Sequence, residues 1–367
     1  MTTPAPAGDR ASPRSGFRDR LVEAWYARTR KPLAIALAPL SWLFAVIVLA
    51  RRGLYRRGIR RSTRIDVPVV VVGNITVGGS GKTPLVIGLA HALRARGRVP
   101  GIVSRGHGSA NTHPRQVRDT DLPKDVGDEP PLLAATGFPV WIGRDRAAAA
   151  QALVRAHGTC DVVLCDDGLQ HYALQRDVEI VAIDAVRGLG NGLLLPAGPL
   201  REPASRLGEV DAVVELVATP FTKPTTRLAR AFTMTHEPVG WRNLVDPTVA
   251  LDAGGLPRGT VHAVAGTANP QRFFDLVQRL GIDAVTHAFD DHHAFVGADV
   301  AFPDARAILM TAKDAVKCAR FADARFFALD IRVVPDAALV DLVLERLDGR
   351  QAAADPRLPG HQGTADP

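Results

Sequence analysis

The chain has 367 residues, a length that suggests two domains with accessory segments. Its formal net charge of +7 favours anionic partners such as nucleic acid, acidic lipid or phosphorylated substrates. The 3 cysteines are odd in number and form no CxxC pair, which argues against a disulfide framework and a structural zinc site and points to a reducing cytosol.

The N-terminal region changes character at Phe17. Residues 1–15 are rich in Pro, Ser, Gly and charge, so we predict a disordered tail and no cleavable signal peptide. Phe17, Leu21 and Trp25 then recur at helical spacing among arginines, which predicts a short basic amphipathic helix. Residues 33–50 follow without a charge, and as a helix of about 27 Å they are borderline in length for a bilayer.

The apolar segment 33–50 is expected to lie in, or dip into, a membrane interface. Pro39 and Ser41 interrupt its middle, and basic residues at both ends leave its orientation open. The arginines that follow it would hold it on anionic lipid: Arg51, Arg52, Arg56, Arg57, Arg60 and Arg61. A true span and a buried core helix of a soluble domain remain the alternatives. We therefore assign residues 16–62 to membrane-associated helices.

Two α/β regions are predicted beyond this segment. An apolar strand at 67–73, a glycine-rich turn, a helix at 84–96 and a strand at 100–104 open a parallel sheet. Further strands are predicted at 140–142, 161–165, 178–184 and 212–216, and a helix at 146–157. The second region has strands at 261–265, 307–311 and 325–329 and a helix at 270–280. We predict a P-loop domain at 63–235, a second, smaller α/β domain at 236–349 and a disordered tail at 350–367.

The glycine-rich turn ends in Gly81, Lys82 and Thr83, the core of a Walker A loop. In such a loop backbone N–H groups surround phosphate oxygens, the lysine reaches the β- and γ-phosphates and the hydroxyl binds Mg²⁺. Thr76 replaces the first glycine of the pattern, but the strand before the turn and the helix after it are the required context. An ordinary strand–helix turn is the plainer alternative. The predicted nucleotide-binding residues are Thr76, Val77, Gly78, Gly79, Ser80, Gly81, Lys82 and Thr83.

The strand at 161–165 runs into Asp166 and Asp167. An apolar strand that ends in Asp places a carboxylate beside the P-loop, at the edge of the sheet where Mg²⁺ sits. Adjacent carboxylates point in different directions, so one could hold the metal and the other a water or the substrate. A strand followed by a polar Asp-Gly turn is the alternative. With the P-loop upstream, we expect Thr83, Asp166 and Asp167 to bind Mg²⁺.

Eight sequence blocks together resemble one known family, the tetraacyldisaccharide 4′-kinases that act in lipid A biosynthesis in Gram-negative bacteria. The resemblance covers about residues 33–341. Its blocks are GNITVGGSGKTP (73–84), SRGHG (104–108), VGDEP (126–130), DDGLQH (166–171), LLPAGPLREP (194–203), AGTANPQRFF (265–274), FDDHHAF (289–295) and TAKDAVK (311–317). Thr76 agrees with this family. His107 replaces its usual Tyr and Ala312 its usual Glu, and no function is transferred to Ala312.

The resemblance implies a lipid kinase. The expected reaction is transfer of the ATP γ-phosphate to the 4′-hydroxyl of a tetraacylated glucosamine disaccharide 1-phosphate, which forms lipid IVA. It implies ATP and Mg²⁺ as cofactors, a cleft between the two domains, and a position on the cytoplasmic face of the bacterial inner membrane. The expected partners are the lipid-linked disaccharide and an anionic membrane surface, with no nucleic acid, and the oligomeric state stays open.

The catalytic residues are assigned from the same resemblance. Asp128 of the VGDEP block is the candidate proton acceptor, the role of the corresponding Asp in similar proteins. A histidine of the DHH run could orient it, and we prefer His292 over His293. Lys82 completes the catalytic set. Possible substrate or phosphate contacts are Arg105, Glu129, Arg146, Gln170, His171 and His293; for the two arginines a surface salt bridge is the plainer interpretation.

Three other functions fit less well. A membrane-bound regulatory ATPase would carry a signature lysine near Val77, and a targeting GTPase would need an N/T-K-x-D motif that the run at 311–314 lacks. A nucleic-acid-binding protein would be expected to place aromatic stacking residues beside its arginines, whereas this cluster follows an apolar run. The ATPase is kept as the alternative to the kinase.

Overall fold

The computed structural model describes residues 17–27, 31–78, 81–109, 113–118, 120–217, 230–252, 255–267, 269–291 and 293–354. Its strands are β1 (Val69–Gly73), β2 (Pro100–Ser104), β3 (Arg115–Gln116), β4 (Val140–Ile142), β5 (Val162–Asp166), β6 (Val178–Asp184), β7 (Ala212–Val217), β8 (Ala231–Asn243), β9 (Ala250–Leu251), β10 (Val261–Ala265), β11 (Val285–Ala288), β12 (Ala307–Thr311) and β13 (Phe326–Pro335). Its α-helices are α1 (Phe17–Tyr26), α2 (Pro32–Arg56), α3 (Lys82–Ala95), α4 (Pro123–Val126), α5 (Pro130–Ala134), α6 (Arg146–Ala156), α7 (Pro270–Arg279), α8 (Ala312–Cys318) and α9 (Ala337–Ala354).

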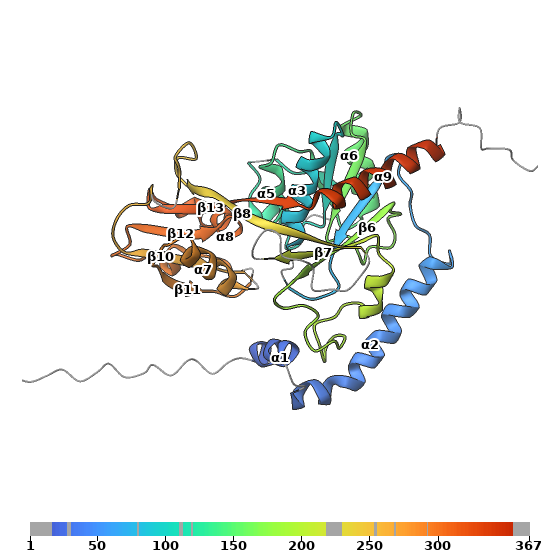
Figure 1. Cartoon of the computed structure of the whole chain (residues 1–367), viewed down its shortest axis with the longest axis horizontal. Helices are drawn as coiled ribbons and strands as arrows, with labels where there is room; N and C mark the ends of the chain where they lie inside the picture. The colour runs from blue at the N-terminus through green and yellow to red at the C-terminus, as the bar shows by residue number, and fades with distance from the viewer. Residues whose placement is uncertain are drawn as a thin grey trace, which may run out of the picture.

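The described strands form one sheet in the order β11-β10-β12-β13-β8-β7-β6-β1-β5-β2-β4-β3, with β9 paired to β8 (Figure 1). We call the part from β3 to β7 the first lobe. There β1 lies between β5 and β6 in parallel register, and its valines are fully buried because helices cover both faces. Helices α3 and α9 pack on one face and α6 on the other. The predicted α/β fold with a P-loop type of parallel sheet is confirmed.

The second lobe consists of the parallel strands β11, β10, β12 and the start of β13. Phe273 and Phe274 of α7 are buried on one face of this sheet, and Ala315 and Cys318 of α8 on the other. The long strands β8 and β13 pair antiparallel and run from one lobe into the other (Figure 1). The boundary predicted at residue 235 falls inside β8, which pairs with β7 at its start and with β13 further along.

The last helix returns to the first lobe. After β13 the chain enters α9, whose side chains Leu339, Val343 and Leu347 are fully buried in the core that also contains α3. Helix α9 runs to Ala354, so it includes the first residues of the predicted tail at 350–367. Residues 355–367 and the predicted tail at 1–15 lie outside the described residues.

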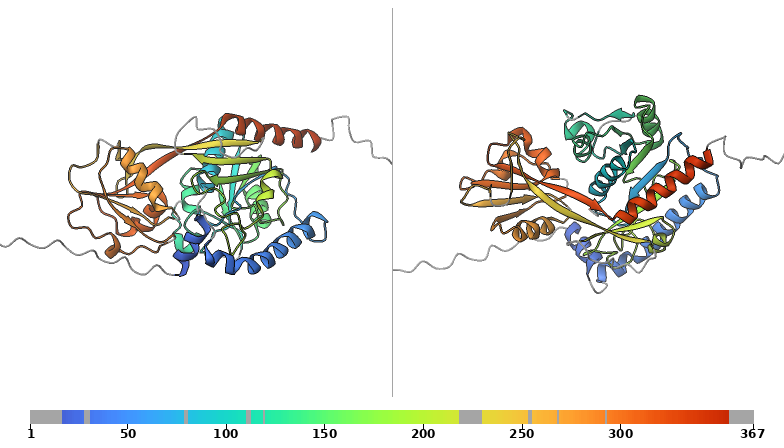
Figure 2. Two further views of the ribbon diagram at one scale, coloured as in Figure 1. Left: turned by 60° about the horizontal axis from the view of Figure 1, so that its bottom comes forward. Right: turned by 45° about the horizontal axis from the view of Figure 1, so that its top comes forward.

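Helices α1 and α2 lie along the outside of the first lobe (Figure 2). Helix α1 is fixed by Trp25, whose indole N–H donates to the Pro196 carbonyl at 2.9 Å. Helix α2 has 25 residues and contains Pro39, and its only buried side chains are Ala34 and Ser41. Its large apolar side chains face outward: Ile35, Leu40, Trp42, Leu43, Val46, Ile47 and Leu49 are more than half exposed. Such exposure does not fit the alternative of a core helix.

Candidate active site

The turn after β1 is fixed by buried polar contacts. The side-chain amide of Asn74 donates to the Gly78 carbonyl at 3.2 Å, and Arg201 Nη2 donates to the Asn74 carbonyl at 3.1 Å. Gly81 precedes α3 with φ of +78°, and a Cβ there would lie 2.8 Å from Leu216 Cδ2. Glycine is favoured here, because any other residue would be strained in the left-handed backbone and would push the Leu216 side chain aside. The turn therefore presents the N-terminus of α3, a position that favours anions.

The predicted P-loop residues lie along this turn. Thr76 is buried and bridges to Leu200, and the Val77 amide donates to the Pro199 carbonyl at 2.8 Å. Lys82 and Thr83 are the first two residues of α3. Gly79 and Ser80 lie outside the described residues.

The two carboxylates after β5 meet the P-loop side chains directly. Thr83 Oγ1 donates to Asp166 Oδ2 at 2.9 Å, and Lys82 Nζ lies 3.6 Å from Asp167 Oδ1. Parallel register places β5 beside β1, so their carboxyl ends share one edge of the sheet. Asp167 has φ of +49°, a left-handed conformation that Asp tolerates. The structure thus brings together Lys82, Thr83, Asp166 and Asp167 as the sequence predicted.

The two carboxylates differ in protonation. Asp166 is fully buried, and burial, followed by the negative charge of Glu129, raises its pKa to about 7. Burial alone would raise the pKa of Asp167 as well, but Lys82 and Arg201 outweigh it and lower this pKa to about 2. Arg201 Nη2 also donates to Asp167 Oδ1 at 3.1 Å. Asp167 is therefore an ionised partner of the cations, whereas Asp166 exchanges its proton near neutral pH.

The acidic pair of the VGDEP block faces lysines of the second lobe. Asp128 Oδ2 lies 3.4 Å from Lys317 Nζ, and Glu129 Oε1 lies 3.9 Å from Lys313 Nζ. The negative charge of Glu129 contributes to the raised pKa of Asp166, so this block lies within electrostatic reach of the P-loop carboxylates. Both predicted residues of the block thus lie where the two lobes meet.

The histidines of the DHH run have separate positions. His293 Nε2 lies 2.9 Å from Asp299 Oδ2, and its ring packs against Phe289 and Phe295. The described contacts of His293 are therefore within its own lobe, which favours a structural role. His292, the preferred partner of Asp128, lies outside the described residues.

The buried side chain of Arg146 and the half-buried side chain of His171 lie together behind Asp167. Arg146 Nη2 donates to the Asp167 carbonyl at 3.2 Å, and its Nη1 lies 3.5 Å from His171 Nδ1. Burial, followed by the charge of Arg146, lowers the pKa of His171 to about 4, so this imidazole is neutral at pH 7. The surface salt bridge considered for Arg146 is wrong, because the side chain is buried. Arg105 is exposed near Arg146.

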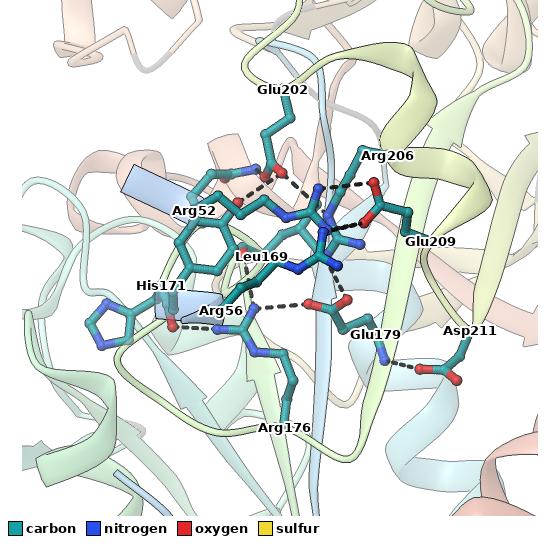
Figure 3. Close-up of polar contacts among 12 residues, drawn as sticks. Arg52, Arg56, Leu169, His171, Arg176, Glu179, Glu202, Arg206, Glu209 and Asp211 are labelled. Atoms are coloured by element: carbon teal, nitrogen blue, oxygen red, sulfur yellow. Dashed lines mark hydrogen bonds and ion pairs between the residues drawn. The ribbon is translucent and has the colours of Figure 1, made fainter. Parts of the chain in front are cut away.

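Gln170 leads into a charged network that sequence reasoning missed. Its side-chain amide donates to the Asn74 carbonyl at 3.1 Å and to Glu202 Oε1 at 2.7 Å. Beyond Glu202, Figure 3 shows ion pairs that connect the segment after β5, the segment after Arg201 and the end of α2: Arg176–Glu179, Arg206–Glu179, Arg206–Glu202 and Arg52–Glu209. The GPLREP block was recognised in the sequence. Only the fold shows that Arg201 donates a hydrogen bond to Asp167 and that Glu202 accepts one from Gln170.

A parallel sheet, a glycine turn that opens a helix, and a carboxylate that ends the neighbouring strand define the class of P-loop proteins. A family model described as tetraacyldisaccharide-1-P 4′-kinase matches residues 33–348. The tetraacyldisaccharide 4′-kinase of Methylobacillus flagellatus is 46% identical over 90% of this chain and 96% of its own length. The enzyme of that name from Azoarcus sp. BH72 is 48% identical over 89% of this chain and 96% of its own.

The fold of this chain also resembles a solved structure, LpxK from Aquifex aeolicus in complex with ATP. The TM-score is 0.73 at 29% identity, and the match covers 86% of this chain and 99% of that one. The chain belongs to the tetraacyldisaccharide 4′-kinase family.

Proposed function

We propose that this chain transfers the γ-phosphate of ATP to the 4′-hydroxyl of a tetraacyldisaccharide 1-phosphate, which yields lipid IVA. The family match over residues 33–348 supports the reaction. Within the site, the main support is the contact of Thr83 with Asp166, which joins the P-loop to the carboxylate after β5. The alternative of a regulatory ATPase loses its support, because the curated relatives are kinases of a lipid disaccharide.

The donor set beside the P-loop fits Mg²⁺. Within the described part of the chain, Asp166 Oδ1 is buried and has no hydrogen-bond partner, and its other oxygen already meets the Thr83 hydroxyl. Hard oxygen ligands of this kind are those that Mg²⁺ prefers. Thr83, Asp166 and Asp167 would hold the ion, which when bound neutralises charge on the phosphate oxygens.

The protein's own side chains supply the rest of the reaction. The 4′-hydroxyl oxygen forms a bond to the γ-phosphorus, the bond from that phosphorus to the β–γ bridging oxygen breaks, and ADP leaves. Lys82 compensates charge on the β- and γ-phosphates. The hydroxyl proton passes to the carboxylate of Asp128, which His292 orients. Arg105, Glu129 and Arg146 remain the proposed contacts of substrate or phosphate. Gln170, His171 and His293 contact Glu202, Arg146 and Asp299 respectively, and we propose that they act by shaping the site.

Transfer of label from γ-labelled ATP to purified tetraacyldisaccharide 1-phosphate tests the proposed function. We expect a labelled lipid product that forms only with Mg²⁺ and whose label survives extraction into organic solvent. ATP turnover with no label on the lipid would refute the kinase assignment and favour the regulatory ATPase.

We expect the Mg²⁺ requirement to depend on pH. Below about pH 7, Asp166 carries a proton when no metal is bound, and Mg²⁺ has to displace it. The free Mg²⁺ at half-maximal transfer should therefore rise as the pH falls, by up to about tenfold per unit. Titrations of Mg²⁺ at about pH 6 and about pH 8 measure the effect. Equal Mg²⁺ midpoints at both pH values would contradict it.

We propose that α2 lies on the cytoplasmic face of the inner membrane. The helix is long and apolar enough to cross a bilayer. Its most apolar 18-residue stretch has a mean hydropathy of 2.5, and 11% of that stretch is buried. Arg52 pairs with Glu209 and is directed to the protein, whereas Arg56 lies 3.7 Å from Glu209 and stays largely exposed. The exposed arginines after the helix remain for anionic lipid: Arg57, Arg60 and Arg61. A surface-bound enzyme avoids the cost of about 0.8 kcal/mol for each CH₂ taken from the bilayer.

Replacing Arg57, Arg60 and Arg61 together with Gln is expected to weaken binding to anionic vesicles by about 10²-fold, since each basic residue contributes about 1 kcal/mol. Co-sedimentation at low and high salt measures this. Residual binding to neutral vesicles, through the apolar face of α2, should not change. Preferential binding to DNA over vesicles would instead support the nucleic-acid alternative.

A further inference from the structure

Helix α8 carries two lysines one turn apart, in the TAKDAVK block to which no role was assigned. Lys317 reaches Asp128 at 3.4 Å, and Lys313 reaches Glu129 at 3.9 Å and Asp291 at 3.3 Å. An i, i+4 spacing puts both lysines on one face of the helix. The acidic pair belongs to the first lobe and the lysines to the second, so α8 meets the proposed catalytic base from the other lobe.

The side chain of Lys317 is buried, and its ammonium group lies among defined neighbours. Its side chain is 7% exposed, and its Nζ lies 3.8 Å from Asp314 Oδ1 and 5.9 Å from the centre of the Phe295 ring. Asp314 is itself fully buried and accepts hydrogen bonds from the Gly266 amide at 3.0 Å and the Thr311 hydroxyl at 2.7 Å. A buried cation needs anionic partners, and here they are Asp314, fixed within the second lobe, and Asp128.

The ion pair between Lys317 and Asp128 has a role in the proposed reaction. Asp128 has to be ionised and directed at the substrate hydroxyl before it can accept the proton. A cation within about 4–6 Å favours the ionised form of a carboxylate. Among the described residues Lys317 Nζ has no hydrogen-bond partner, and it lies 3.4 Å from Asp128 Oδ2, a distance at which its charge acts on that carboxylate.

We propose that Lys317 is a positioning residue for Asp128: it holds the carboxylate ionised and aimed at the 4′-hydroxyl, and it touches no reacting atom. The proposal rests on the proposed function, and it extends the catalytic set from the P-loop and VGDEP blocks to α8. The lysine keeps its own protons throughout, and the proton of the 4′-hydroxyl passes to Asp128 alone.

A second ion pair between the lobes provides a matched control. Arg272 Nη1 of α7 lies 3.4 Å from Asp184 Oδ2 at the end of β6. This pair joins the same two lobes but does not involve the VGDEP block. Its loss would weaken contact between the lobes without removing the cation beside Asp128.

The test compares Lys317→Met, Lys317→Arg and Arg272→Met in steady-state transfer to the lipid over a range of pH. For Lys317→Met we expect kcat to fall about 10–100-fold, less than the about 10²–10⁴-fold for loss of the general base itself, with little change in KM for ATP or lipid. The acidic limb of kcat/KM should move up by about one pH unit. Lys317→Arg keeps the charge and should keep the limb in place, and so should Arg272→Met.

An unmoved limb in Lys317→Met, an equal shift in Arg272→Met, or a defect confined to KM would each overturn the proposal. Thermal unfolding of each variant shows whether it is folded, and Lys317→Gln is the second neutral variant if the Met form is not. The wild-type enzyme distinguishes failure of this proposal from failure of the proposed function. If the wild type transfers phosphate to the lipid but the acidic limb of kcat/KM does not move in Lys317→Met, only the role of Lys317 is rejected.

Discussion

Lys82→Ala is expected to lower the rate of phosphoryl transfer by at least about 10³-fold, the upper range for loss of one preorganised electrostatic group. Lys82 is the first residue of α3 and lies 3.6 Å from Asp167, so in the absence of nucleotide its charge is held beside the proposed metal site. With ATP present the ammonium is expected to turn to the phosphates, and no other described lysine stands on this turn.

Single-turnover transfer from labelled ATP measures this effect apart from product release. Because Arg201 also pairs with Asp167, that carboxylate keeps a cation in the variant and the fold should persist. Lys124→Ala, at an exposed position of α4, is the matched control and should act like the wild type. A rate for Lys82→Ala within tenfold of the wild type would contradict the assignment of the nucleotide site.

Asp128→Asn is expected to lower kcat by about 10²–10⁴-fold, the usual range for loss of a general base. Asn has the shape of Asp but cannot accept the hydroxyl proton. Nucleotide affinity should stay close to that of the wild type, because the carboxylate of Asp128 pairs with Lys317 of the second lobe.

The pH profile makes this prediction specific. The variant should lose the acidic limb of kcat/KM, since the group that titrates there has been removed, while Glu129→Gln should retain it. Binding of ATP measured at equilibrium gives the control for the nucleotide site. An Asp128→Asn enzyme with a normal kcat would show that another group takes the proton.

Much of the first lobe could be predicted because its signals are local. The strands β1, β2, β5 and β6 are short apolar runs, and a Gly-Lys-Thr turn after one of them and two Asp residues after another indicate a shared edge. The contact of Thr83 with Asp166 follows from parallel pairing alone.

The missed features depend on contacts between distant residues. Strand β8 was not predicted because Pro238 and Gly240 interrupt it, and it is stabilised by pairing with β13, which lies about ninety residues further along the chain. The arginines after the apolar segment were all interpreted as lipid contacts, yet Arg52 and Arg56 pair with Glu209. The meeting of Lys317 with Asp128 likewise has no local signal, because α8 and the VGDEP block belong to different lobes.

The return of α9 has a consequence for how this chain matures. Leu339, Val343 and Leu347 complete the core beside α3, although they are made after every strand of both lobes. The nucleotide-binding lobe therefore cannot complete its core until α9 has left the ribosome, and the second lobe, whose strands are all synthesised earlier, has the chance to assemble first. Helix α9 thus completes the core of a lobe whose other helices and strands are made before it.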